Sequence, residues 1–436
     1  MRLFTITQNL LAVTTFAMVA QQCCLAADWT QFRGSGGAGI STDSSLPLTW
    51  SDTENLSWKT ELPGAGSSSP IVLGNRIFVT SYSGYGVPKE NGGDIKSLQR
   101  HLTCVSRTDG KILWTKSVPG LLPEDNYQGY ISEHGYASNT PVTDGERVYC
   151  FFGKSGVVAF DLDGSQLWQT DVGKESSNRR WGSAASLILY KDYVIVNASE
   201  ESQSIRALDK KTGKEIWKAS GAALELAYGT PSLITSNEGR TDLVVAVPGE
   251  IWGLNPDTGK IRWFEEHQLT GNICPSIVAD KETVFVFGGF RSAGSLALQI
   301  NGEKTSPKPK VLWTSKTSSY VSTPVYYEGH LYWIDDRGQA YCLNAKTGEM
   351  VYRERVSELE AGGRPVYASP VLAKGNIYVP SRWNGVLVLP AKPKYQVLAQ
   401  NKFKDESDFN ATPAISQDEL FLRSNRFLYC VATQKK

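Results

Sequence analysis

The feature of this sequence that most restricts its fold is an internal repeat with a period of about 45 residues. Each copy opens with a small residue, usually Ser or Thr, followed by Pro and a short apolar run. The copies begin at Ser69-Pro70, Thr140-Pro141, Ala185-Ser186, Thr230-Pro231, Cys274-Pro275, Thr323-Pro324, Ser369-Pro370 and Thr412-Pro413. Most of the eight copies are 43 to 49 residues apart, and the first two are 71 apart.

A second phrase, Asp-x-x-Thr-Gly-Lys-x-x-Trp, follows at a fixed place in each copy. The clearest examples run from Asp209 to Trp217 and from Asn255 to Trp263. Asp or Asn opens a turn by bonding its own backbone, and Gly supplies a positive φ. We expect the Trp to begin the next strand and to lie between sheets. The phrase lacks the glycine spacing and the following helix of a phosphate loop, so a turn is the better interpretation.

Four short antiparallel strands in each of eight repeats predict an all-β, eight-bladed β-propeller. The last copy, 411–431, has room for three strands, and residues 55–60 look like a strand without a copy of their own. We therefore expect this N-terminal strand to complete the last blade and close the ring. Residues 55–436 form a single propeller in this interpretation. Two long insertions, 83–100 and 119–138, belong to the first blade, and long loops on a rigid scaffold often carry function.

The N-terminus is typical of an export signal. Residues 1–27 combine one charge, at Arg2, with an apolar stretch and small residues before Asp28. Residues 28–54 are then an N-terminal extension. A lipid anchor would be attached at Cys23 or Cys24, but Gln21-Gln22 precede them where a lipoprotein signal has Leu and small residues. We expect cleavage after Ala26 or Ala27 and a protein of the periplasm or cell envelope, or a secreted one.

Composition excludes several classes of protein. The apolar fraction is 41% and the charged fraction 20%, a globular balance, and the net charge of +1 argues against nucleic-acid binding. No segment after the signal is long and apolar enough to cross a membrane. Five cysteines remain without a CxxC pair, which favours buried thiols over a zinc site or disulfides. No GxSxG, HExxH or Walker motif is present. We expect a monomer.

The two phrases together resemble the pyrroloquinoline-quinone (PQQ) type propeller repeat, over roughly residues 50–431. Trp29-Thr30-Gln31-Phe32-Arg33-Gly34 is similar to the start of exported bacterial proteins of this kind. Quinoprotein dehydrogenases share the repeat, and so does the non-catalytic propeller lipoprotein of the outer-membrane β-barrel assembly machinery. The dehydrogenase resemblance implies a vicinal cysteine disulfide, a Trp floor, a Ca²⁺ ion held by Glu, Asn and Asp, and an Asp base. The only adjacent cysteines here are Cys23 and Cys24, inside the signal.

Two sets of loops share one face of such a propeller: those leading into the first strands and those joining the second and third strands. The candidate ligand-binding residues on them are His134, Arg180, Trp181, Glu225, Tyr228, Arg291, Asp335, Asp336, Arg337, Arg364, Arg382 and Trp383. Arg binds carboxylates or phosphates, and aromatic rings stack on sugars or flat molecules. The alternative is that these groups pair with one another and are solvated.

Individual residues leave further alternatives open. His134 is a general base or ligand, or a histidine satisfied by its surroundings. Asp335 and Asp336 share a cation, or form a turn before Gly338. Trp181 and Trp383 lie outside the repeat's Trp position, which favours ligand contact.

Without a catalytic constellation, the sequence predicts an exported, non-catalytic binding or scaffold propeller that engages a protein or glycan partner in the cell envelope through one polar rim. No cofactor is predicted in this hypothesis. The alternative is a PQQ-dependent oxidoreductase of alcohols or sugars that uses PQQ with Ca²⁺. A third class, a hydrolase or lyase of polysaccharides, is supported only by export and the rim acids.

Overall fold

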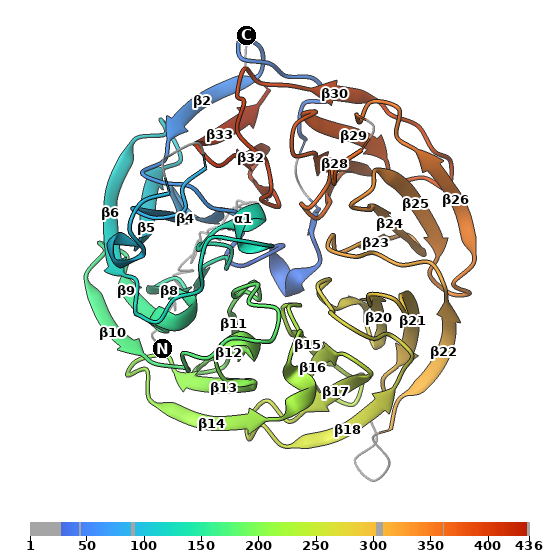
Figure 1. Cartoon of the computed structure of the whole chain (residues 1–436). Coiled ribbons are helices and arrows are strands. Elements are labelled where there is room, and N and C mark those ends of the chain that lie inside the picture. The colour runs from blue at the N-terminus through green and yellow to red at the C-terminus, as the bar shows by residue number, and fades with distance from the viewer. Residues whose placement is uncertain (1–27, 43–44, 89–91, 302–307, 361, 434–436) are drawn as a thin grey trace, which may run out of the picture.

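A computed structural model describes residues 28–42, 45–88, 92–301, 308–360 and 362–433. The predicted signal, with Cys23 and Cys24, lies outside the described residues. The strands form eight sheets arranged in a ring around a central axis (Figure 1), which confirms the predicted eight-bladed propeller. Each blade has its first strand nearest the axis and its last strand on the outer wall.

The first four blades follow the chain in order. Blade one contains β3 (Ile71–Leu73), β4 (Arg76–Ser83), β5 (Gln99–Ser106) and β6 (Ile112–Pro119), and blade two contains β7 (Val142–Thr143), β8 (Arg147–Phe151), β9 (Val157–Asp161) and β10 (Gln166–Thr170). Blade three contains β11 (Ile188–Tyr190), β12 (Tyr193–Ala198), β13 (Ser204–Asp209) and β14 (Glu215–Ser220). Blade four contains β15 (Ser232–Thr235), β16 (Thr241–Val247), β17 (Glu250–Leu254) and β18 (Ile261–Glu266).

The remaining blades continue the same order. Blade five contains β19 (Val278–Asp280), β20 (Thr283–Gly288), β21 (Gly294–Gln299) and β22 (Lys310–Ser315), and blade six contains β23 (Val325–Tyr327), β24 (His330–Ile334), β25 (Gln339–Asn344) and β26 (Met350–Arg355). Blade seven contains β27 (Val371–Ala373), β28 (Asn376–Pro380), β29 (Val386–Pro390) and β30 (Ala399–Asn401). Blade eight contains β31 (Ala414–Ser416), β32 (Glu419–Arg423) and β33 (Phe427–Ala432). The helical turns are η1 (Ser35–Gly37), η2 (Ile95–Ser97), α1 (Ile131–His134), η3 (Gly153–Ser155), α2 (Ser199–Ser202) and η4 (Ala222–Leu224).

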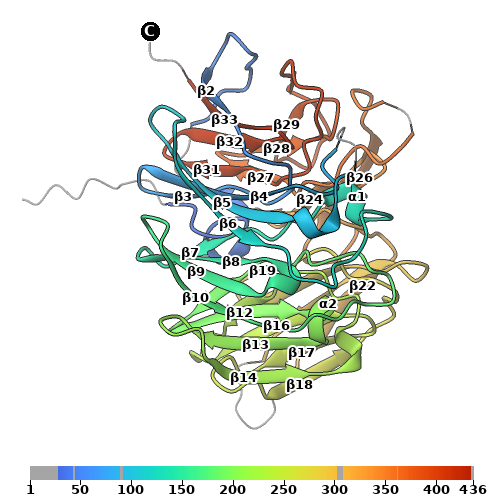
Figure 2. The same cartoon turned by 60° about the vertical axis from the view of Figure 1, so that its left-hand side comes forward.

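An N-terminal strand closes the ring, as the sequence predicts. Strand β2 (Leu56–Glu61) pairs antiparallel with β33 and becomes the fourth strand of the last blade. Figure 2 shows the two lying side by side, one blue and one red. The closure joins the two ends of the propeller and leaves no blade with an open inter-blade face.

The hydrophobic core is divided among the spaces between blades. Separate buried clusters lie between successive blades, and the largest joins blades seven, eight and one. Four of the five cysteines after the signal, Cys104, Cys150, Cys342 and Cys430, are buried in these clusters as free thiols, as expected.

At five blade boundaries, a tryptophan on the outer strand of one blade contacts the glycine-containing turn of the next blade. The Trp168 indole donates a hydrogen bond to the carbonyl of Lys210 at 3.0 Å, and Gly213 of the same turn lies against its ring. Trp58, Trp114, Trp217 and Trp313 make the same contacts with the turn of the following blade. Trp263 is different, because its indole donates to Asp242 within its own blade at 2.9 Å.

One copy of the first phrase is two residues out of register with the prediction. In the fifth blade Ser276, and not Cys274, occupies the position of the Ser or Thr before Pro. The strand β19 begins at Val278, two residues after Ser276, just as β23 begins two residues after Thr323. The sequence prediction was wrong here because Pro275 matched the Pro of the phrase, and Pro is compatible with several positions just before a strand.

The N-terminal extension runs through the centre of the ring (Figure 1). Trp29 forms an antiparallel bridge with Val72, and β1 (Ile40–Ser41) pairs parallel with β27 of the seventh blade. Between them Arg33 is 1% exposed, and its guanidinium donates to the carbonyls of Thr323, Pro324 and Pro370 at 2.8–3.0 Å. The extension therefore fills part of the central channel, which the sequence did not predict.

The two first-blade insertions pack on each other. Tyr136, from the second insertion, contacts the rings of Tyr82, Tyr85 and Tyr127. This cluster holds α1 over the mouth of the channel, as the central position of α1 in Figure 1 shows. Among the described residues, the helices are all too short or too polar to span a bilayer.

Candidate functional site

A funnel-shaped cavity of about 180 Å³ opens on the face predicted to carry the site. We call it the funnel. Phe32 of the extension lies at its base, and its wall is mostly apolar. Residues from all eight blades and from the N-terminal extension converge there, so the funnel depends on the complete ring.

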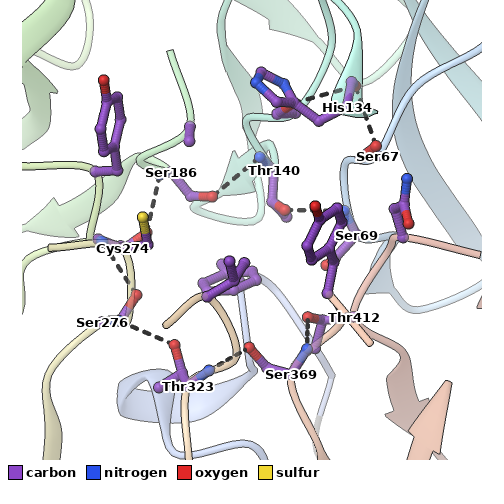
Figure 3. A pocket seen from close by; sticks show the side chains of 18 of the residues that line it. Ser67, Ser69, His134, Thr140, Ser186, Cys274, Ser276, Thr323, Ser369 and Thr412 are labelled. Atoms are coloured by element: carbon purple, nitrogen blue, oxygen red, sulfur yellow. Dashed lines mark hydrogen bonds between the residues drawn. The ribbon is translucent and has the colours of Figure 1, made fainter. Parts of the chain in front are cut away.

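A ring of hydroxyl groups surrounds the lower part of the funnel (Figure 3). From Ser69 to Ser369, the backbone N–H of each member donates to the side-chain hydroxyl of the member in the next blade, at 2.9–3.1 Å. The bonds run from Ser69 through Thr140, Ser186, Thr230, Ser276, Thr323 and Ser369 to Thr412. These residues are the Ser or Thr of the first repeat phrase. The phrase therefore has a structural role, because it satisfies buried donors where the blades converge.

Aromatic side chains form the upper wall. Trp181 contacts Tyr130 with ring centroids 4.3 Å apart and stacks on Tyr228 at 5.6 Å. Tyr320 and Tyr367 line the opposite side. Cys274 is half-buried in the wall, and burial raises the pKa of its thiol to about 12, so it is a neutral apolar group there.

His134 lies at the edge of the funnel with both ring nitrogens engaged. Its Nε2–H donates to the Trp181 carbonyl at 2.8 Å, which leaves Nδ1 to accept from the Ser138 hydroxyl at 2.6 Å. Burial lowers the pKa of His134, so the imidazole is neutral near pH 7. Of the two sequence interpretations, the structure supports the satisfied histidine, which holds the Trp181 loop in place.

Arg382 and Trp383 lie on the rim beside the funnel. The Arg382 guanidinium is paired with Glu133 at 2.8 Å and with Asp408 at 2.6 Å. The Trp383 indole donates to Asp408 at 3.0 Å, yet the side chain is 45% exposed. Trp383 is thus a large apolar surface held in a fixed position and presented to solvent.

Asp335 and Asp336 have different partners in the structure. Asp335 accepts the backbone N–H groups of Arg337 and Gln339 at 3.0 and 2.8 Å, as an acid in a turn does. Asp336 forms an ion pair with Arg364 at 3.2 Å. Gly338 has φ 77°, so the backbone here forms the turn that was one of the two alternatives. Within the described ranges, no group of three or more His, Cys, Asp or Glu side chains is arranged to hold a metal ion.

The other predicted residues differ in which cavity, if any, they line. Tyr228 joins the wall, while Arg180 is exposed and Glu225 accepts from the backbone of Asn178 at 2.8 Å; neither lines a cavity described here. Arg291 and Arg337 line a second, larger groove next to the funnel. The predicted residues thus share one face but occupy two adjoining hollows and their margins.

A buried polar network supports the funnel between blades two and three. The Tyr228 hydroxyl donates to Glu200 at 2.5 Å, and Lys154 pairs with Asp125 at 3.0 Å. Glu201 accepts from Ser183, and its other carboxylate oxygen has no partner. Burial raises the pKa of Glu201 to about 7. The network holds Tyr228 in the wall, and it places the ionisable carboxyl of Glu201 in a buried environment.

The residues here do not fit a Ca²⁺–PQQ site. A hard cation needs several oxygen ligands, and PQQ carries carboxylates that need cationic partners. The funnel offers one carboxylate, Glu133, which is already bound to Arg382, and its lining contains no Arg or Lys. No pair of adjacent cysteines occurs after the signal. We therefore derive no chemistry through this cofactor.

Sequence reasoning missed Phe32, Tyr130 and the hydroxyl ring as parts of the funnel. Tyr130 lies in the insertion 119–138, whose length pointed to a functional loop without indicating any particular residue. The Ser or Thr of the first phrase was visible as a repeat, but its partner in the next blade is set by the ring. No local signal places Phe32 in the channel, because that position follows from where the extension docks.

Several known proteins are similar to this chain. A family profile described as outer membrane protein assembly factor BamB matches residues 94–224, 201–302 and 304–397. BamB of Yersinia pestis is 22% identical over 343 residues, which cover 66% of this chain and 82% of the relative. Tetrathionate hydrolase of Acidithiobacillus ferrooxidans is 22% identical over 371 residues, covering 78% and 68%.

Solved structures share the fold at low identity. BamB from Moraxella catarrhalis superposes with a TM-score of 0.61 at 15% identity, covering 87% of this chain and 99% of that structure. A europium-containing methanol dehydrogenase gives 0.62 at 13%, covering 91% and 89%. Because the profile matches span well over half of the sequence, the chain belongs to the PQQ-type propeller family described as outer membrane protein assembly factor BamB.

Proposed function

We propose that this protein is an exported, non-catalytic scaffold of the cell envelope that holds a protein partner on its funnel face. The finding that carries the proposal is the difference between the two faces of the ring. One face has an aromatic funnel, an exposed Trp383 and arginines at its rim. The other face carries the Asp-Gly and Thr-Gly turns of the repeat, whose side chains bond their own backbones.

The chemistry of the rim suits a protein surface. Trp and Arg side chains are enriched at the centres of protein interfaces, because they bury much area and make directed hydrogen bonds. Trp383 is the exposed member of the pair here, and Arg382 is buried beside it. Trp383 and Arg382 are adjacent and share Asp408, so the pair is preorganised. Preorganised side chains lose little conformational entropy on binding.

The relatives give partial support. The family is described as an outer membrane assembly factor, and a structure of the same fold is a methanol dehydrogenase. Since one fold hosts both activities, the choice rests on the site. The donor set in the funnel lacks the oxygen ligands and cations that a quinone with Ca²⁺ requires, which favours the scaffold.

The experiment is quantitative co-purification from membrane extracts of the source cells. The wild type is compared with Arg382→Gln/Trp383→Ala on the rim and Lys260→Gln/Lys346→Gln on the opposite face. Thermal unfolding verifies that each variant is folded. We expect the rim variant to lose a specific envelope protein that the control retains. Equal recovery of every protein by all three contradicts the proposal.

A second arm addresses the alternative. The purified protein is titrated with PQQ, with and without Ca²⁺, and tryptophan fluorescence is followed. We expect no saturable quenching. Saturable quenching that requires Ca²⁺ overturns the scaffold proposal in favour of a quinoprotein.

A further inference from the structure

A wide groove between blades five and six opens beside the funnel. Its volume is about 770 Å³, in the upper part of the range of ligand-binding clefts. We call it the basic groove. Six cationic side chains line it: Arg291, Lys316, Arg337, Arg353, Arg355 and Arg364. Two carboxylates, Asp335 and Asp336, line it as well. The whole chain has a net charge of +1, so this concentration of positive charge is local.

The two acids do not neutralise the groove. Asp335 accepts from two backbone N–H groups and the Tyr341 hydroxyl, and Asp336 forms an ion pair with Arg364. Two carboxylates against six cations leave four positive charges in excess. Among the residues that the structure describes, no carboxylate lies within ion-pair distance of the other five cations. Arg355 donates to the backbone carbonyls of Arg337 and Glu360 instead. A concave surface with unbalanced cations attracts an anionic partner.

The guanidinium groups are arranged over aromatic rings. Arg353 lies over Tyr341 at 5.7 Å from the ring centroid, and Arg364 lies over Tyr320 at 4.9 Å. A guanidinium held flat on a ring keeps its N–H fork directed outwards, where it can bind a carboxylate. The same arrangement covers the ring faces on which a sugar would stack.

Apolar side chains stand among these cations. Phe290 is 43% exposed and Met350 is 47% exposed, and both line the groove. The backbone before Phe290 and at Arg291 is tightly turned, with Arg291 at φ 75°. Tyr320 lines both the groove and the funnel, so the two hollows adjoin at this side chain.

We propose that the basic groove binds an extended acidic segment of a partner protein, in which carboxylates alternate with apolar side chains. The carboxylates meet the arginine forks, the apolar side chains meet Phe290 and Met350, and one end of the segment points towards the funnel. An acidic glycan fits less well, because its rings find Tyr320 and Tyr341 covered and it offers no apolar side chain to Met350. This inference rests on the proposed function and adds the chemistry of the partner.

The test uses two synthetic peptides and one glycan with the complete mature protein. One peptide alternates Glu or Asp with Phe or Leu, and the other carries Gln and Asn in place of the acids. An oligogalacturonate supplies carboxylates on a sugar chain. Fluorescence anisotropy at low and at physiological salt measures each dissociation constant. We expect binding of the acidic peptide only, weakening as salt is raised.

Arg337→Gln/Arg353→Gln should weaken that binding by about tenfold, since two charge-assisted contacts are lost. Lys260→Gln/Lys346→Gln removes the same charge from the opposite face and should leave binding unchanged. Equal weakening by both variants, or absence of acidic-peptide binding to the wild type, overturns the proposal. Oligogalacturonate binding that equals the peptide and is lost in the groove variant also overturns it.

Failure here is separable from failure of the scaffold. If the rim variant loses its envelope partner while the groove variant retains it and binds no acidic peptide, the scaffold stands and the basic groove is not its acidic-segment site. If the acidic peptide binds the groove but no partner depends on the rim, the basic groove stands and the rim interface is wrong.

Discussion

The glycine of each Thr-Gly turn meets two separate requirements. Gly213 has φ 71°, which an L side chain rarely adopts, and a Cβ atom there would lie 2.6 Å from the Trp168 ring. The positive φ could be predicted from the turn sequence, whereas the lack of space for a Cβ is set by the Trp of the neighbouring blade. One residue therefore shapes its own hairpin and receives the tryptophan that joins two blades.

Gly213→Ala should lower the free energy of unfolding by about 2–4 kcal/mol, from backbone strain and a clash with Trp168. Gly329→Ala is the matched control, because Gly329 has φ 78° with nothing near its would-be Cβ, and about 1 kcal/mol is expected. Urea unfolding measures both. Equal losses would show that the contact between Gly213 and Trp168 contributes nothing.

Glu201 makes stability depend on pH. Its pKa is raised from 4.5 to about 7, so the folded protein binds this proton more tightly than the unfolded chain does. Stability should therefore fall as pH rises from about 4.5 through 7, by up to about 3 kcal/mol. Glu201→Gln should flatten this dependence and be more stable than the wild type at pH 8.

The control for that measurement is Glu238→Gln, which changes an exposed carboxylate. Denaturant unfolding at pH 5.5 and pH 8 gives the comparison. An unchanged slope in the Glu201→Gln variant would mean that the buried carboxyl titrates normally.

Among the elements, the N-terminal extension shows where sequence reasoning stopped. Repeat phrases specify each hairpin locally, so the eight blades, the closing strand and the face carrying the loops could all be predicted. Arg33 has no repeat counterpart, and three of its carbonyl partners, on Thr323, Pro324 and Pro370, are 290 to 337 residues away. Such long-range docking leaves no periodic signal. For the same reason the funnel's loops were predictable, whereas its base at Phe32 was not.

Arg33→Ala should destabilise the protein by about 2–4 kcal/mol, because it leaves buried carbonyls on blades six and seven without donors. It should also release the extension to protease, which removes the base of the funnel. Ser35→Ala changes an exposed residue of the same segment and should leave both properties unchanged. Denaturant unfolding and limited proteolysis test this. If the extension of the Arg33→Ala variant were as protected from protease as that of the wild type, Arg33 would not be what holds the extension in the channel.

The whole molecule is a closed ring, and its site exists only in the closed form. Blade eight needs β2 from the N-terminal side, and the hydroxyl ring runs through all eight blades. A chain starting at residue 45 keeps β2 and should unfold cooperatively, although less stably. A chain starting at residue 62 exposes the edge of β33 and should self-associate. Thermal unfolding and size-exclusion chromatography compare them, and a monomeric, cooperative shorter chain would refute ring closure as the source of stability.

The most direct test of the central claim is photo-crosslinking in living cells of the source organism. A photoreactive amino acid replaces Trp383 on the funnel face or Lys346 on the opposite face, and crosslinked products are identified by mass spectrometry. If the protein is a scaffold that binds through this face, position 383 gives a discrete crosslink to one envelope protein and position 346 gives none. The same products from both positions, or none from position 383, would contradict it.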